Sequence, residues 1–215
     1  MAAYVVWDWN GTLFDDVALC IQVMNGMLEK RGLPRLAGPE QYRQVFTFPV
    51  EEYYKALGFD FGREPFSQLA VEYISEYDRR ALGCPLRAGA EAALAELHRR
   101  GVKQVIASAS HKMALEEQVA HLGVAGYFQA LLGVEDSLGR GKSGLAGDFL
   151  RQAGAVGDAL FVGDTLHDWE TAAALGCPCA LLAGGHQARP RLEATGAPVL
   201  DTFQELLALP QLAGR

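Results

Sequence analysis

The expected fold of this chain follows from one short segment, Tyr4-Val5-Val6-Trp7-Asp8-Trp9-Asn10-Gly11-Thr12. Its first four residues form a continuous apolar run, which is typical of a strand covered on both faces of a parallel sheet. The run stops at Asp8, and the Asn-Gly pair that follows favours a turn. Because open α/β sheets bind ligands outside the carboxyl ends of their strands, Asp8 is predicted to lie at a ligand site.

The C-terminal two-thirds of the chain continues this pattern of apolar strands. Further strands are predicted at residues 102–107, 130–134, 159–162, 179–182 and 197–200. Amphipathic stretches lie between them, such as residues 88–100 and 113–122, and each of these two is followed by a glycine, as is common after a helix. Strands that alternate with helices indicate parallel βαβ units with right-handed crossovers. The prediction is an α/β fold with a Rossmann-like parallel sheet.

Residues 15–83 interrupt the alternation, because no good strand pattern occurs among them. Four helices are predicted there instead, at residues 17–31, 39–46, 50–57 and 65–82. Glycine and proline residues between these helices mark turns. The expected organisation is a Rossmann-like core of residues 1–14 and 84–215 with an inserted α-helical cap domain of residues 15–83.

The composition is that of a soluble globular protein, since 50% of the 215 residues are hydrophobic and 21% are charged. A net charge of -7 disfavours binding to nucleic acid or to an anionic membrane surface. No apolar stretch approaches the roughly 20 residues of a membrane helix, and no basic segment at the N-terminus indicates a signal peptide. The four cysteines lack the spacing of a zinc site. We therefore expect a cytoplasmic protein with reduced thiols.

Three later segments also place polar residues next to predicted strands or helices. Ser108 follows the apolar run 102–107, and Ser110 is expected to cap the next helix. Lys142, in the glycine-rich stretch 139–144, opens another predicted helix. Asp164 and Asp168 follow the strand at 159–162, and their spacing lets both carboxylates converge on a hard cation such as Mg²⁺.

Taken in order, these four segments resemble the motifs of the haloacid dehalogenase superfamily of phosphatases and phosphotransferases. The size of the helical insertion and the sequence Phe14-Asp15-Asp16 resemble the phosphoglycolate phosphatase branch. The resemblance implies that Asp8 is a nucleophile that forms an aspartyl-phosphate. It also implies that Lys142 neutralises the charge of the phosphoryl group.

The remaining site residues follow from the same resemblance. Phosphoryl oxygens are expected to contact the Ser108 hydroxyl and the backbone amides of Trp9, Asn10 and Ala109. The expected cofactor is Mg²⁺. Its predicted ligands are Asp8, the backbone carbonyl of Asn10, Asp164 and Asp168.

Asn10 is the one departure from the family pattern at the centre of the site. Most phosphatases of the family carry a second aspartate there, which protonates the leaving oxygen and later deprotonates the attacking water. An amide does neither, and general acid–base catalysis is typically worth ~10²–10⁴ in rate. The sequence therefore predicts a formed Mg²⁺ and phosphate site with impaired proton transfer.

Three functions stay open at this stage. The preferred one is a Mg²⁺-dependent phosphatase acting on a small phosphomonoester, with a bound water or another group, such as His111 or His167, carrying the proton. The second resembles the phosphonoacetaldehyde hydrolases and needs a cap lysine that forms a Schiff base, for which Lys55 is the candidate. The third is a protein of low or no activity that binds a phosphorylated ligand.

Two cap residues are candidates for substrate recognition. Arg43 and Thr47 lie about one helical turn apart, and Arg43 is either a reader of a substrate carboxylate or a solvated surface residue. The expected partner is a small phosphorylated metabolite, with no nucleic acid and no membrane. We expect a monomer or a homodimer.

Overall fold

The computed structural model describes residues 2–135 and 141–212. Residues 139 and 140 of the glycine-rich stretch before Lys142 lie outside this described part. Within it, no helix has the length and apolar character needed to cross a membrane.

Six strands of the described residues form one parallel sheet in the order β3-β2-β1-β4-β5-β6. Their bounds are β1 Tyr4–Trp7, β2 Lys103–His111, β3 Ala130–Val134, β4 Ala159–Gly163, β5 Cys179–Leu182 and β6 Val199–Leu200. The central strand β1 is paired on both sides, so that Val6 lies opposite Val105 of β2 and Phe161 of β4. This is the strand order of a doubly wound sheet, whose direction of winding reverses between β1 and β4.

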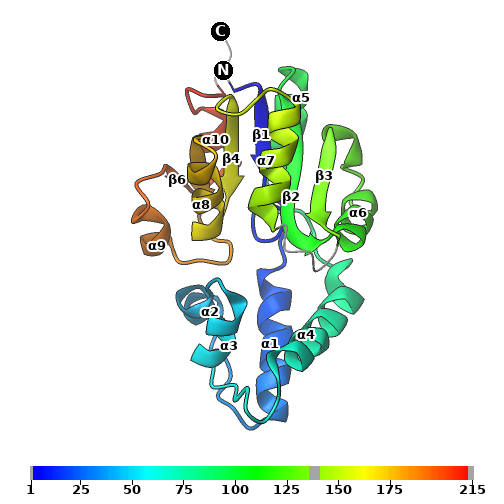
Figure 1. Ribbon diagram of the computed structural model, residues 1–215, viewed down its shortest axis with the longest axis vertical. Helices are drawn as coiled ribbons and strands as arrows, with labels where there is room; N and C mark the ends of the chain where they lie inside the picture. Colours follow the sequence, from blue (N-terminus) through cyan, green and yellow to red (C-terminus); the bar gives the residue numbers. More distant parts are fainter. Residues whose placement is uncertain (1, 136–140, 213–215) are drawn as a thin grey trace.

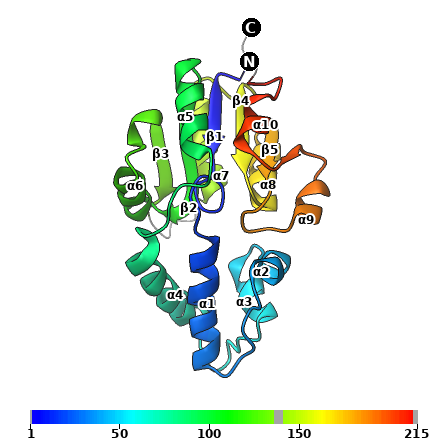
Figure 2. The same cartoon turned by 180° about the vertical axis from the view of Figure 1, so that it is seen from behind.

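Helices cover both faces of the sheet (Figures 1 and 2). They are α5 Ala90–Arg99, α6 Lys112–His121, α7 Lys142–Gln152, α8 Leu166–Ala174, α9 Arg189–Glu193 and α10 Phe203–Leu207, with a short 3₁₀ helix at Ala125–Tyr127. On one face, Val5 and Trp7 of β1 belong to the same buried cluster as Leu94 of α5 and Leu206 of α10. The alternate β1 residues pack with α7 and α8 on the other face. Burial on both faces explains why β1 has no polar side chain.

The inserted segment forms four helices, α1 Val17–Lys30, α2 Pro39–Val45, α3 Val50–Ala56 and α4 Phe66–Ala81. They lie beyond the carboxyl ends of the strands (Figure 1). They also have a hydrophobic core of their own, which includes Met24, Leu28, Tyr42 and Leu69. The predicted α/β class with a helical insertion is confirmed.

One local prediction was wrong. Strand β2 continues past the apolar run to His111, because the backbone still pairs with β3 after the side chains leave the core. Helix α6 therefore begins at Lys112, and its N-cap is His111, whose ring accepts a hydrogen bond from the Met113 amide at 3.3 Å. Ser110 lies inside the strand and does not cap the helix.

Candidate active site

The candidate site lies where β1 and β4 end side by side. The amide of Asp8 donates to the Val162 carbonyl at 2.8 Å, which extends the ladder between the two strands by one residue. Gly163 then allows α8 to begin directly against the sheet, because a Cβ at this position would lie 2.1 Å from Cγ of Asp168. The strand ends therefore hold Asp8, Asp164 and Asp168 close together.

Three carboxylates form a compact acidic cluster at this edge. Asp8, Asp164 and Asp168 each offer an oxygen, and these oxygens lie within 4.8 Å of one another. Thr12 joins two of them, since its hydroxyl donates to Asp164 Oδ1 at 2.7 Å and lies 3.3 Å from Asp8 Oδ2. Carboxylate oxygens are hard ligands that suit Mg²⁺, which usually takes one or two carboxylates plus water and substrate oxygens, so not all three need to bind it directly.

Asp168 also caps the helix that carries it. Its Oδ2 accepts hydrogen bonds from the amide of Thr165 at 2.9 Å and from the Thr165 hydroxyl at 2.7 Å. This capping box fixes the first turn of α8. Asp168 therefore caps α8, as acids at this position commonly do, and also belongs to the acidic cluster.

Lys142 provides the positive charge of the cluster. It is 4% exposed, and its Nζ contacts both Asp8 Oδ1 and Asp168 Oδ1. Burial opposes its charged form, but Asp168 and Asp8 outweigh burial and raise its pKa. Burial, together with the negative charges of Asp168 and Asp164, raises the pKa of Asp8 to about 8, although the positive charge of Lys142 acts in the opposite direction. Three carboxylates facing one ammonium leave a negative charge that a divalent cation would balance.

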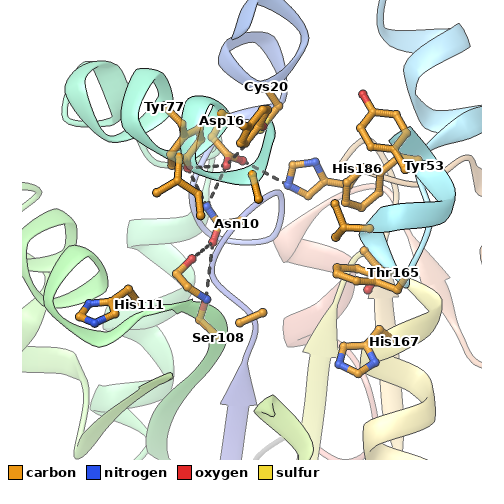
Figure 3. A pocket seen from close by; sticks show the side chains of 18 of the residues that line it. Asn10, Asp16, Cys20, Tyr53, Tyr77, Ser108, His111, Thr165, His167 and His186 are labelled. Carbon is orange, nitrogen blue, oxygen red and sulfur yellow. Dashed lines mark hydrogen bonds and ion pairs between the residues drawn. The ribbon is translucent and has the colours of Figure 1, made fainter. Parts of the chain in front are cut away.

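Asn10 lies at the centre of a hydrogen-bond network between the sheet and the cap (Figure 3). Its Oδ1 accepts from the Ser110 hydroxyl at 2.7 Å and from the Ser108 hydroxyl at 3.5 Å. Its Nδ2 donates to Asp16 Oδ2 and to the Tyr77 hydroxyl, both at 2.8 Å. The side chain of Asn10 thus connects β2, the start of α1 and the cap helix α4.

Asp16 is a buried carboxylate that sequence reasoning did not single out. It accepts from the Gly11 amide at 2.9 Å and from the Tyr77 hydroxyl at 2.7 Å, besides the Asn10 amide. Burial opposes its ionisation, but His186 and these hydrogen bonds outweigh burial and lower its pKa. Asp16 therefore acts as a fixed negative acceptor behind Asn10.

His186 is the second residue that sequence reasoning missed. Its Nε2 lies 3.4 Å from Asp16 Oδ1, and its Nδ1 lies 2.7 Å from the Tyr42 hydroxyl. Its backbone amide donates to Asp164 Oδ2 at 2.5 Å. A weaker signal was available, because His186 follows Gly184 and Gly185 a few residues after the end of the buried strand β5.

The pair of His186 and Asp16 should make the stability of the fold depend on pH. Burial lowers the pKa of His186, but Asp16, with Asp164 and Asp8, raises it from 6.5 to about 9. Because the pKa is higher in the folded state, protonated His186 stabilises the fold. This stabilisation is complete below about pH 6.5 and is lost as the pH rises through about 9. This shift of the pKa corresponds to about 3 kcal/mol of unfolding free energy.

Urea unfolding in EDTA, at about pH 6 and about pH 10, tests this expectation in the wild type and in His186→Gln. We expect the wild type to lose more unfolding free energy than the variant between the two pH values. Equal losses in both proteins would contradict the assignment of the effect to His186.

A cavity of about 400 Å³ separates the strand ends from the cap. Asp8, Asn10, Ser108, Ala109 and Lys142 line it from the core, and Asp168 and His186 also reach it. Its described cap lining is largely aromatic and aliphatic and includes Phe46, Phe48, Tyr53, Tyr54, Phe66 and Ile74. His111 and His167, the two histidines considered as proton carriers, also line the cavity.

The structure does not bring Arg43 and Thr47 to this cavity, so the predicted recognition of a carboxylate by Arg43 has no support from its position. The Arg43 guanidinium donates to the carbonyls of Gly184 at 2.8 Å and Gly185 at 2.9 Å. The Thr47 hydroxyl lies 3.3 Å from Arg191 Nη2. Arg43 therefore joins the cap to the loop after β5, and Thr47 lies against Arg191 of α9.

Trp9 and Lys55 also point elsewhere. The Trp9 indole is fully buried in the core and donates to Gln118 at 2.8 Å, so this side chain does not face a ligand. Lys55 is exposed and pairs with Glu52 at 2.7 Å. Neither residue is among those that line the cavity.

The chain is similar in sequence and in fold to several known proteins. A family model described as "Haloacid dehalogenase-like hydrolase" matches residues 5–182. A phosphoglycolate phosphatase of Rhodobacter capsulatus is 27% identical, over 98% of this chain and 96% of that protein. The tyrosine-protein kinase PtkA of Mycobacterium tuberculosis is 25% identical, over 94% of this chain and 70% of that protein. The structure of a haloacid dehalogenase-like family protein from Streptococcus pneumoniae superposes with a TM-score of 0.82 at 18% identity, over 95% of this chain and 96% of that one, which is a likeness of fold.

Proposed function

The chain belongs to the haloacid dehalogenase-like hydrolase family, and we propose that it is a Mg²⁺-dependent phosphatase that hydrolyses a small phosphomonoester through an aspartyl-phosphate on Asp8. The observation that carries the proposal is the contact of the buried Lys142 with Asp8 at a cavity, in a cluster with the carboxylates of Asp164 and Asp168. A nucleophilic carboxylate, a fixed cation and a hard-metal donor set are the parts that phosphoryl transfer needs.

In the first proposed step, a carboxylate oxygen of Asp8 attacks phosphorus and the bond from phosphorus to the leaving oxygen breaks. The leaving oxygen departs with the electron pair and takes a proton from water. In the second step, water attacks the phosphorus of the aspartyl-phosphate. The bond to Asp8 breaks, the carboxylate is restored and inorganic phosphate leaves with the remaining protons.

The surrounding residues orient and neutralise the phosphoryl group. Lys142 offsets its charge from the side of Asp8, and the Ser108 hydroxyl and the Ala109 amide are proposed donors to its oxygens. Asp8, the Asn10 carbonyl, Asp164 and Asp168 are the proposed ligands of Mg²⁺. When bound, Mg²⁺ supplies further charge neutralisation at the phosphoryl oxygens.

The alternative function, which resembles that of the phosphonoacetaldehyde hydrolases, needs a cap lysine at the cavity. Among the described cap residues, no lysine lines the cavity. Lys55 pairs with Glu52, and the exposed Lys30 pairs with Glu72 at 2.7 Å. A Schiff base needs an amine that reaches the substrate. The third possibility, binding without turnover, differs from the proposal in two observables, the phosphorylation of Asp8 and the release of phosphate.

Removal of the metal tests the proposed function directly. We expect EDTA to abolish phosphate release from p-nitrophenyl phosphate and added Mg²⁺ to restore it. Asp164→Ala should weaken Mg²⁺ binding by at least ~10–100-fold, since even residues that only support metal ligands have effects of this size. The matched control is Asp201→Ala, because Asp201 is 67% exposed in its side chain and does not line the cavity. Full activity in EDTA would refute the proposed role of the metal.

A further inference from the structure

We infer that the leaving group accepted by this site is aromatic, so that the substrate is an aryl phosphate and not an alkyl phosphate that carries a carboxylate. This inference rests on the proposed phosphatase function and adds to it the chemical class of the substrate. Two separate features of the molecule lead to it: the lining of the cavity and the hydrogen bonds of Asn10.

The cap side of the cavity is built from aromatic rings in mutual contact. The ring centroid of Phe46 lies 5.4 Å from that of Phe48 and 5.3 Å from that of Tyr53, in edge-to-face arrangements. The Phe48 ring reaches across to the core, where its centroid lies 5.2 Å from that of His167. Another aromatic ring placed among them would make the same kind of contact. Phe48 is 38% exposed and Ile74 is 55% exposed, so apolar surface remains available to such a group.

The charges around the cavity disfavour a second anionic group on the substrate. Among the described lining residues, Lys142 already contacts Asp8 and Asp168, and the ring of His186 pairs with Asp16. Asp78 adds a further acidic side chain to the lining. A carboxylate placed against the aromatic rings would lose its hydration and meet no Lys or Arg that is not already paired, which is costly. The buried Tyr53 hydroxyl, which has no hydrogen-bond partner, could donate one neutral hydrogen bond but would not balance the charge.

The remaining basic side chains do not change this conclusion. His111 uses its Nδ1 to accept from the Met113 amide, and His167 lies 3.8 Å from Glu170. Arg43 is occupied by two backbone carbonyls outside the cavity. The described lining therefore accommodates one phosphoryl anion and a leaving group that is flat and uncharged.

The hydrogen bonds of Asn10 limit the leaving group independently of the lining. Both ends of its amide are engaged, and it carries no proton that it can transfer. The ring nitrogens of His186 are likewise engaged by Asp16 and Tyr42. A phenol such as the tyrosine side chain ionises with a pKa of about 10, whereas bulk water, which an alkyl alcohol resembles, has a value of about 15.7. A phenoxide therefore departs without the proton that an alkoxide needs.

Two phosphonates that cannot be hydrolysed test recognition apart from turnover. Benzylphosphonate has the shape of phenyl phosphate, and 3-phosphonopropionate has the shape of 2-phosphoglycolate. In calorimetric titrations with Mg²⁺ present, we expect benzylphosphonate to bind at least ~10-fold more tightly. Equal binding, tighter binding of 3-phosphonopropionate, or no binding of either compound would overturn the inference.

A matched pair of variants on α4 connects this preference to the cap. Ile74 lines the cavity, whereas Val71 on the same helix is 67% exposed and is not among the lining residues. Ile74→Lys should weaken benzylphosphonate ~10-fold and strengthen 3-phosphonopropionate, and Val71→Lys should change neither. Both positions are exposed, so both variants should fold. An unchanged preference in Ile74→Lys would mean that the cap lining does not contact the leaving group.

Turnover separates this inference from the function on which it rests. Phenyl phosphate and benzyl phosphate are both aromatic but release a phenoxide and an alkoxide, and we expect kcat/KM, which reports the step that releases the leaving group, to be higher for phenyl phosphate by ~10² or more. Equal kcat/KM values would overturn the part of the inference that concerns the leaving group. Tight binding of benzylphosphonate without any release of phosphate from phenyl phosphate would instead refute the phosphatase proposal and leave the aromatic preference standing.

Discussion

Asp8→Asn is expected to lower kcat by about 10⁴-fold or more, as is found when the nucleophile of a covalent mechanism is removed. The side chain keeps its shape but loses the charge that attacks phosphorus. Folding should survive, because Asp8 is one of three clustered carboxylates and burial already raises its pKa to about 8. Lys142 would keep its contact with Asp168. Loss of one like charge should leave the unfolding free energy unchanged or slightly higher.

Rates with p-nitrophenyl phosphate, thermal unfolding and intact mass after rapid acid quench together test this expectation. The wild type should give a phosphoryl adduct on Asp8, and the variant should give none. Asp15→Asn is the matched control, because Asp15 is exposed in the same loop. Wild-type activity in Asp8→Asn would remove the proposed nucleophile and most of the mechanism.

The sheet and its acidic edge could be predicted from sequence for a physical reason. Strands of a parallel sheet are buried on both faces, so each appears as an apolar run, and the polar residue that ends the run marks the carboxyl edge. This reasoning located Asp8 and Asp164, whose strands β1 and β4 are fully buried. The same reasoning misjudged the end of β2, because hydrogen bonding between strands continues after burial ends.

The network behind Asn10 could not be predicted in the same way. Asp16 begins a helix, Tyr77 lies near the end of another, and His186 follows β5, so only the packing of the cap on the core brings the three together. The surroundings of Arg43 could not be predicted for the same reason, since helical spacing shows which residues share a face but not what that face packs against.

Asn10 fits its surroundings better than an aspartate would. Asp16 is an acceptor of hydrogen bonds when it is ionised, and the amide of Asn10 offers it a donor. An aspartate at this position would place a second carboxylate against Asp16 in a buried site. One of the two acids would then have to hold a proton, because like charges at short range raise a pKa. This arrangement makes the exchange of Asn10 for aspartate an informative experiment.

Asn10→Asp is expected to raise kcat for alkyl phosphates such as benzyl phosphate by ~10–10³. The neighbouring Asp16 should keep the new carboxyl protonated, and a protonated carboxyl is the general acid that the wild type lacks. The gain should be smaller for phenyl phosphate and p-nitrophenyl phosphate, because their leaving oxygens depart without help. A smaller gain is also expected if the new proton stays in a hydrogen bond to Asp16. Loss of the amide hydrogen that donates to the Tyr77 hydroxyl should lower the unfolding free energy by about 1–3 kcal/mol.

The control for this experiment is chemical purity, because Asn10-Gly11 is a plausible deamidation site and a trace of aspartate would mimic low wild-type activity. Peptide mass analysis should therefore precede the kinetics. If hydrolysis of the aspartyl-phosphate limits the rate, the wild type should accumulate phosphorylated Asp8 and the variant should not. A wild type that is free of deamidation and matches Asn10→Asp on benzyl phosphate would mean that another group supplies the proton. Since His111 and His167 line the cavity, they would then be the first residues to replace.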